Sequence, residues 1–152
     1  MKNKRALAAL FFTPIILLVF LAILNNKPEA SHNIASLIVS GVEVTAEIAD
    51  SPSEKMQGLM FRKTLGENEG MFFIYENEDY YSYWMKNTFI PLDLIWLDSD
   101  YTVVDIKTNA PPCLEETCPS YKPATPARYV LELNAGWSEK NSLKIGDKIE
   151  KK

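Results

Sequence analysis

The feature that most constrains this chain is an uncharged apolar run near its N-terminus, Ala6–Leu24. The run is 19 residues long, and only Thr13 and Pro14 interrupt its series of Ala, Leu, Ile, Val and Phe. As a helix it would reach about 28 Å, close to the ~30 Å hydrocarbon core of a bilayer. A helix that is apolar on every side fits poorly on a small soluble domain. The run therefore predicts an N-terminal hydrophobic helix, either a transmembrane anchor or a signal segment.

The residues around this run predict its orientation. Three cations precede it: Lys2, Lys4 and Arg5. Such cations stay on the cytoplasmic side, so the remainder of the chain is expected outside the cytoplasm. A cleavage site needs small residues in an A-x-A-like arrangement, which Pro28–Ala30 (PEA) matches poorly. We expect a single-pass protein of the cell membrane, with the membrane as partner through residues 6–24; a secreted or periplasmic protein after cleavage is the alternative.

Three regions follow from this organisation. Residues 1–24 form the anchor or signal segment, residues 25–36 are a polar tether, and residues 37–152 are long enough for one domain. The chain has 16 Lys and Arg and 20 Asp and Glu; without the three N-terminal cations, 13 remain against 20, a formal charge of −7. A surface of that sign repels phosphate backbones, so nucleic acid is not an expected partner.

The domain is expected to be mostly β. Val42–Ile48 alternates apolar and polar residues, which is typical of a half-buried strand. Further strand-length segments are bounded by Gly, Pro, Asn or Asp: 37–39, 71–75, 80–86, 92–98, 102–107 and 128–133. A capping box at Ser51–Glu54 predicts one short helix that ends before Gly66, with Met56, Leu59 and Met60 on its apolar face.

A second short helix is predicted from Asn134, including Trp137, and residues 145–149 are expected to form a closing strand or turn. The fold class is mostly β (α+β). The expected architecture is a small curled antiparallel sheet, a barrel or sandwich of about seven strands with one or two short helices, preceded by the N-terminal hydrophobic helix.

Several motifs carry a family resemblance. They are Gly58–Arg62 (GLMFR), Gly70–Phe73 (GMFF), Trp84–Asp93 (WMKNTFIPLD), the PC and CPSY pieces around Cys113 and Cys118, and Tyr129–Glu132 (YVLE). In this order they resemble the uncharacterised family of conserved membrane-associated proteins called domain of unknown function 192, over about residues 42–150. The resemblance implies a compact β-rich domain behind an N-terminal membrane segment. It implies no established activity and brings no catalytic residues.

The two cysteines, Cys113 and Cys118, predict a disulfide that closes a short loop in an oxidising exterior. A redox-active pair and half of a metal site are the alternatives. Four residues separate the cysteines instead of the two of a C-x-x-C motif, and no other cysteine exists to complete a zinc site. The one histidine, His32, lies in the tether. We therefore predict no metal, no cofactor and no histidine-based catalysis.

Polar and aromatic residues of the Trp84–Asp93 stretch are the candidate ligand-binding site: Arg62, Trp84, Lys86, Asn87 and Asp93. Lys86 and Asp93 flank a turn-like connection, so a structural salt bridge or turn-fixing network is one interpretation, and convergence in a cleft is the other. Among the strand carboxylates, Glu132 alternates with Leu131 and Leu133, which predicts that it is exposed to solvent.

These residues favour a non-enzymatic binding or accessory module of the cell envelope, which recognises a small molecule, a glycan or a protein. One alternative is a hydrolase or lyase that uses Asp93 and Lys86, because carboxylate and lysine chemistry need no histidine. The other is a purely structural component of an envelope complex.

Overall fold

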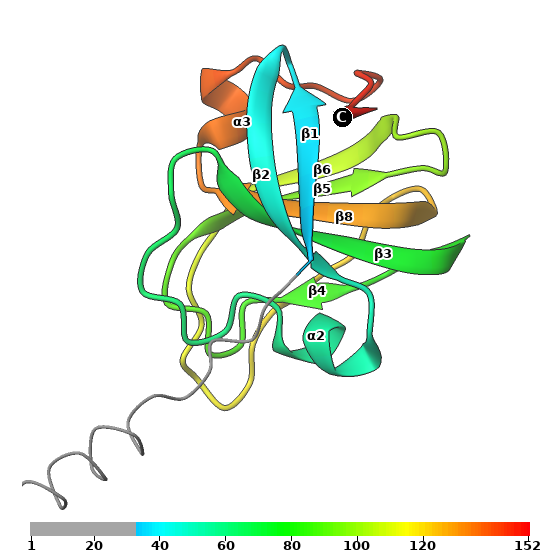
Figure 1. The fold of residues 1–152 in the computed structure, drawn as a ribbon. Coiled ribbons are helices and arrows are strands. Elements are labelled where there is room, and N and C mark those ends of the chain that lie inside the picture. The colour runs from blue at the N-terminus through cyan, green and yellow to red at the C-terminus, as the bar shows by residue number, and fades with distance from the viewer. Residues whose placement is uncertain (1–32) are drawn as a thin grey trace, which may run out of the picture. The chain divides into compact units, whose positions relative to one another are not determined.

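The computed structural model describes residues 33–152, whose strands form one large curled sheet, a half-barrel (Figure 1). In spatial order its strands are β6 (Val103–Ala110), β5 (Leu92–Leu97), β8 (Ala127–Asn134), β3 (Glu69–Asp79), β2 (Val42–Ala49), β1 (Ile34–Val39) and β9 (Glu150–Lys151). A small second sheet pairs β4 (Tyr83–Trp84) with β7 (Ser120–Tyr121). The helices are α2 (Pro52–Gln57) and α3 (Trp137–Lys140).

The predicted anchor, residues 1–24, and most of the tether lie outside the described residues. From residue 33 onward, the chain has no helix of the length and apolarity that a membrane crossing needs.

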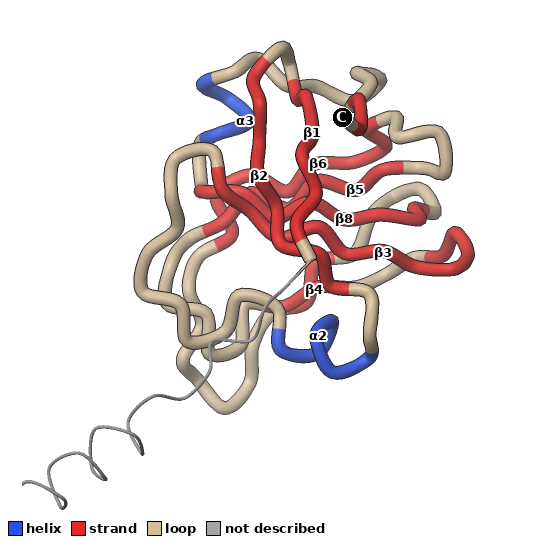
Figure 2. Tube along the Cα trace, viewed as in Figure 1, coloured by secondary structure: helices blue, strands red, loops and turns tan. Residues whose placement is uncertain are grey.

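The sheet is antiparallel except at one pair, which corrects the expectation of an all-antiparallel sheet. Strand β2 runs parallel to β3, with Ala46 beside Gly70 and Ile48 beside Phe72. Parallel neighbours need a crossover connection, and α2 with the long loop after it supplies that connection. Figure 2 shows this loop among the long tan connections gathered at one end of the sheet.

Short-range signals place the first strands and the first helix. The β1–β2 turn has positive φ at both Ser40 and Gly41, as a two-residue hairpin turn requires. The predicted capping box of α2 is present: the side chain of Ser51 caps Glu54, and Glu54 reaches back to the Ser51 backbone.

The helix is shorter than predicted. It ends at Gln57, because Gly58 takes a positive φ of 49° and directs the chain away from the helix axis. The predicted apolar helix face is therefore wrong. Met56 remains 74% exposed, and Leu59 is buried only in the turn after the helix.

Apolar side chains form a core on each face of the sheet. One core contains Phe72, Leu131 and Leu133 and is closed by Trp137 of α3. The other contains Phe73, Trp96 and Val130, together with Tyr83 and Met85 from the region of β4. Strand β8 lies between β5 and β3 and contributes side chains to both cores, so almost all of its residues are buried. Glu132, in the middle of β8, is consequently buried as well.

The predicted strand at 80–86 is shorter, since it pairs only at Tyr83–Trp84. Residues 145–149, expected to form a closing strand or turn, contain a turn at Ile145 and Gly146, and the last strand is Glu150–Lys151. Residues before β9 instead bond to the start of β6: the Val103 amide donates to Asp147 (2.8 Å) and the Ile149 amide to Tyr101 (2.9 Å). Since β9 itself pairs with β1, this C-terminal stretch connects the two edges of the half-barrel.

Candidate functional site

A small cleft lies beside α2, on the face of the sheet that carries Phe73 and Glu132. Its volume is about 30 Å³, enough for roughly two water molecules as it stands. One side is the turn after α2, Gln57–Met60, and the other side is Tyr83, Trp84 and Thr88. Phe73 of β3 and Glu132 of β8 also line it, as do Lys55 and Met56 of α2. We call this the Glu132 cleft.

Glu132 is the one carboxylate that lines this cleft. It lies on β8 between Met71 of β3 and Leu94 of β5 and is only 5% exposed. No hydrogen bond or ion pair of its carboxyl group with another residue of the described domain is found, and burial alone shifts its pKa. Burial raises the pKa of this carboxyl to about 8, because a charged carboxylate without a partner is poorly solvated there. At neutral pH Glu132 is therefore mainly a neutral acid that faces the cleft.

The prediction that Glu132 is exposed is wrong. The alternation along β8 is real, but both faces of this central strand are covered. The signal that identifies Glu132 is the run Tyr129–Leu133, in which it is the single polar residue. A near-continuous apolar run is typical of a strand buried on both faces, and a carboxylate inside one is a candidate functional group.

Aromatic side chains surround the acid. The hydroxyl groups of Tyr75 and Tyr83 share a hydrogen bond of 3.0 Å, and Tyr83 packs edge-on against Phe73. Burial, followed by the neighbouring Tyr75 and Glu132, raises the pKa of Tyr83 well above its usual value. The ammonium group of Lys55 lies over the Tyr75 ring, 4.6 Å from its centre. The cleft is thus lined by aromatic rings with a cation near its edge.

Of the five residues predicted to bind a ligand, Trp84 lines the cleft. Its side chain is 52% exposed, whereas the neighbouring Tyr83 and Met85 are buried. This agrees with the period-two alternation of the segment. Because Trp96 and Trp137 are almost fully buried, Trp84 is the accessible member of the chain's three tryptophans.

Lys86 and Asn87 hold the loop of the predicted disulfide, which is present between Cys113 and Cys118. The Lys86 ammonium donates to the carbonyl oxygens of Glu115 (2.8 Å) and Glu116 (2.7 Å). Asn87 donates its amide to the Cys113 carbonyl (2.9 Å). These contacts hold the segment that contains Thr88, which lines the cleft.

Arg62 and Asp93 lie elsewhere. The Arg62 guanidinium makes two hydrogen bonds to the carboxylate of Glu47 on β2, at 2.6 and 2.5 Å, which fastens the turn after α2 to the sheet. Asp93 is fully buried and accepts backbone hydrogen bonds from Asn109 (2.9 Å), Gly136 (3.1 Å) and Ser138 (2.9 Å).

The structure therefore does not bring Lys86 and Asp93 together, because each side chain bonds to a different set of backbone groups. The interpretation of a salt bridge between them is wrong, whereas each of the two residues does fix a loop. Asp93 instead fixes the connection from β8 into α3. The ligand-binding role of the five residues as a set stays a prediction.

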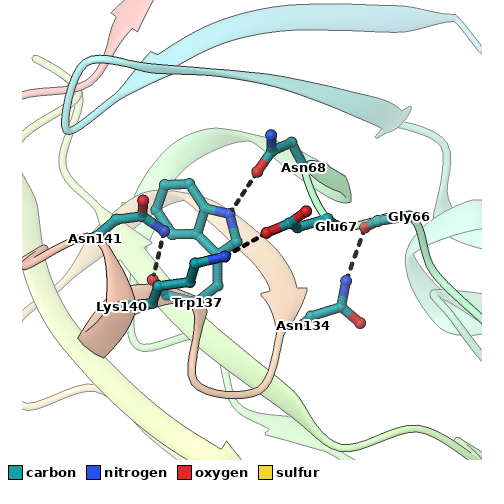
Figure 3. Close-up of polar contacts among 7 residues, drawn as sticks. All are labelled: Gly66, Glu67, Asn68, Asn134, Trp137, Lys140 and Asn141. Atoms are coloured by element: carbon teal, nitrogen blue, oxygen red, sulfur yellow. Dashed lines mark hydrogen bonds and ion pairs between the residues drawn. The ribbon is translucent and has the colours of Figure 1, made fainter.

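A second set of contacts, drawn in Figure 3, holds the loop between α2 and β3. Asn134 donates to the Gly66 carbonyl (2.8 Å), and the indole of Trp137 donates to Asn68 (3.1 Å). Lys140 of α3 pairs with Glu67. The loop is thus held by α3 at this end and by Arg62 near its start. It therefore gives the Glu132 cleft a fixed wall. Within residues 33–152 no cluster of His, Cys, Asp and Glu could hold a metal ion.

Fold and site together define a small β half-barrel domain with a buried acid in an aromatic-lined cleft. The chain belongs to the DUF192 family, described as an uncharacterized ACR, whose model matches residues 35–151. This confirms the resemblance drawn from the motifs.

Relatives and solved structures agree with this assignment. The UPF0127 protein of Pyrococcus abyssi is 31% identical over 110 residues, covering 71% of this chain and 86% of the relative. The UPF0127 protein of Pyrococcus horikoshii is 33% identical over 113 residues, covering 71% and 88%.

Two crystal structures are similar in fold. A Sinorhizobium meliloti protein, provisionally described as a transcription regulator, has a TM-score of 0.72 at 35% identity, covering 81% of this chain and 97% of that one. A Novosphingobium aromaticivorans protein of unknown function has a TM-score of 0.69 at 36% identity, covering 81% and 89%.

Proposed function

We propose that this chain is a binding module of the cell envelope, held at the outer side of the membrane by Ala6–Leu24, and that it receives the polar end of its ligand in the Glu132 cleft. The observation that carries the proposal is Glu132 itself, a buried carboxyl that opens into a cleft without a protein partner. Burying such a group costs stability unless it is paired, and a ligand would supply the pair. The envelope location rests on the apolar run, the cations before it and the disulfide loop.

The structure favours binding over a hydrolase that uses Asp93 and Lys86, because neither residue lines the cleft. Asp93 accepts three backbone hydrogen bonds and Lys86 donates to two carbonyl oxygens, so both groups are engaged in holding loops. An enzyme is the second candidate function, for one reason. The pKa of Glu132, about 8, lies in the range that general acids use near neutral pH. An enzyme of this kind would use Glu132 as its proton donor.

The proposal is tested by thermal stabilisation of the purified full-length protein with a panel of envelope metabolites, glycans and divalent cations. A ligand that binds the native state raises its melting temperature. We expect at least one compound to stabilise the wild-type protein and to quench Trp84, and to lose both effects in Trp84→Ala and Glu132→Gln.

The matched control is Tyr80→Ala, which removes another exposed aromatic ring of the same segment outside the cleft. It should bind as the wild type does. Compounds that stabilise all four proteins equally would place binding elsewhere, and stabilisation by none would favour the structural alternative.

A further inference from the structure

We propose that the ligand group held in the Glu132 cleft is a primary ammonium at the end of an unbranched alkyl chain. This inference rests on the proposed function, because it names the chemistry that the same cleft recognises. The ammonium would pair with the Glu132 carboxylate, and the chain would leave past Met56, Met60 and Trp84, which line the same cleft.

The missing polar partner of Glu132 is the first argument. A buried carboxyl group is normally paired with a cation or with hydrogen-bonding groups. In the described domain the cation on the cleft lining is Lys55, whose ammonium lies over the Tyr75 ring at 4.6 Å and forms no ion pair with Glu132. A ligand cation would therefore supply what the acid lacks.

The lining of the cleft is the second argument. Phe73, Tyr83 and Trp84 contribute aromatic rings, whose faces attract organic cations. An anionic ligand would be repelled by the acidic character of the domain. The volume of about 30 Å³, roughly that of two water molecules, admits the single heavy atom of an ammonium with its first carbon, whereas the four heavy atoms of a guanidinium exceed it.

Proton release is the measurable consequence. Binding would convert the Glu132 carboxylic acid and the alkylammonium into a carboxylate–ammonium pair plus one proton released to solvent. The other titratable or charged groups that face Glu132 are Tyr75 of β3, Tyr83 of β4 and Lys55 of α2. Burial raises the pKa of both tyrosines, so they stay protonated near neutral pH. One proton from Glu132 should accompany each ammonium bound below the pKa of about 8.

The test uses n-butylammonium chloride as the probe and the full-length protein at pH 6, 7, 8 and 9, with Trp84 fluorescence and calorimetry. The probe remains a cation throughout this range. We expect its affinity to rise about tenfold from pH 6 to pH 7 and to level off above pH 8. Calorimetry in two buffers of different ionisation enthalpy should show about one proton released at pH 6. Glu132→Gln should abolish both effects, and Tyr80→Ala should keep them.

A neutral probe, n-butanol, separates this inference from the proposed function. If n-butanol binds the cleft through Glu132 and n-butylammonium does not, the cation inference is wrong and the binding function stands. If neither probe perturbs Trp84, and the broader panel fails as well, both are wrong. Butylammonium affinity that does not change with pH or in Glu132→Gln would also overturn the inference.

Two further probes distinguish the source of the ammonium. A short peptide with one central lysine represents a partner protein, and 1,5-diaminopentane represents a free amine. Tighter binding of the peptide, lost when its lysine is Nε-acetylated, would indicate a protein partner. Tighter binding of the diamine would indicate a small-molecule ligand. Acetylation of the amino groups should abolish binding of the peptide and of the diamine alike, because the ammonium is the recognised group.

Discussion

At the scale of single residues, Glu132 couples the stability of the domain to pH. Its pKa is near the usual value of 4.5 in the unfolded chain and about 8 in the folded one. The folded state therefore binds the proton more tightly, and the resulting stabilisation is complete below pH 4.5. It is lost as the pH rises from there through 8, with a slope of roughly 1.4 kcal/mol per pH unit.

This gives a direct prediction for Glu132→Gln, which keeps the shape of the side chain and cannot ionise. Between pH 5 and pH 8 the wild-type protein should lose stability relative to the variant at close to that slope. Free energies of unfolding from denaturant titrations at several pH values measure the difference. Parallel curves for the two proteins would contradict the buried, unpaired state of this acid.

Asp93, also a buried carboxylate, has a different role, because three backbone amides donate to it. Asp93→Ala leaves these amides without their acceptor, and we expect a loss of about 2–4 kcal/mol in the free energy of unfolding. The control is Asp98→Ala. Asp98 accepts from two amides of an exposed turn, so its loss should cost about 1 kcal/mol or less. Equal effects of the two substitutions would show that Asp93 does not hold α3 in the way described.

At the scale of elements, the disulfide loop and the wall of the cleft form one unit. The Asn87 amide bonds to the Cys113 carbonyl, and Lys86 bonds to two carbonyl oxygens within the loop. Replacing both cysteines by serine should lower the free energy of unfolding by about 2 kcal/mol, because a short loop is no longer closed. It should also loosen the segment that carries Thr88.

Amide hydrogen exchange measures that loosening. In the double-serine variant, we expect faster exchange at Asn87. The Val103 amide, which bonds to Asp147 at the opposite end of the domain, serves as the internal reference after correction for global stability. Unchanged relative exchange at Asn87 would mean that the loop does not support the wall.

Local patterns in the sequence predict several of these elements. The alternation in β2 and the Ser51–Glu54 capping box are both present, since each depends on neighbouring residues only. The length of α2 and the parallel β2–β3 pair could not be predicted in this way. Both depend on how the chain after Gly58 returns to the sheet, which tertiary contacts such as Arg62–Glu47 determine.

At the scale of the whole domain, the curled sheet explains why the candidate site differs from the predicted one. The sequence concentrates polar and aromatic residues at Trp84–Asp93, which suggests convergence. In the fold, Asp93 faces the α3 side of the sheet, and Lys86 reaches the disulfide loop. Glu132 is brought to Trp84 from a strand almost fifty residues later, by packing that no local pattern encodes.

The two faces of the sheet differ in how their cores are built. The core under β1, β2 and Trp137 has no unpaired carboxylate, whereas the core beneath α2 contains Glu132 at a cleft. A domain that buries this acid loses stability as the pH rises from the unfolded pKa of 4.5 to the folded pKa of about 8. We interpret this loss as a functional cost that ligand binding offsets.

The most direct test of this account is a carbon-13 NMR titration of the Glu132 carboxyl group in the full-length protein, with and without n-butylammonium. We expect the free protein to titrate at a pKa of about 8. Saturation with the ammonium probe should shift this pKa downward by about three units, because a neighbouring cation favours the ionised form and the bound carboxyl must be ionised at pH 6 to release one proton there. A carboxyl that titrates near 4.5 and does not respond to the probe would contradict both the buried neutral acid and its role in binding.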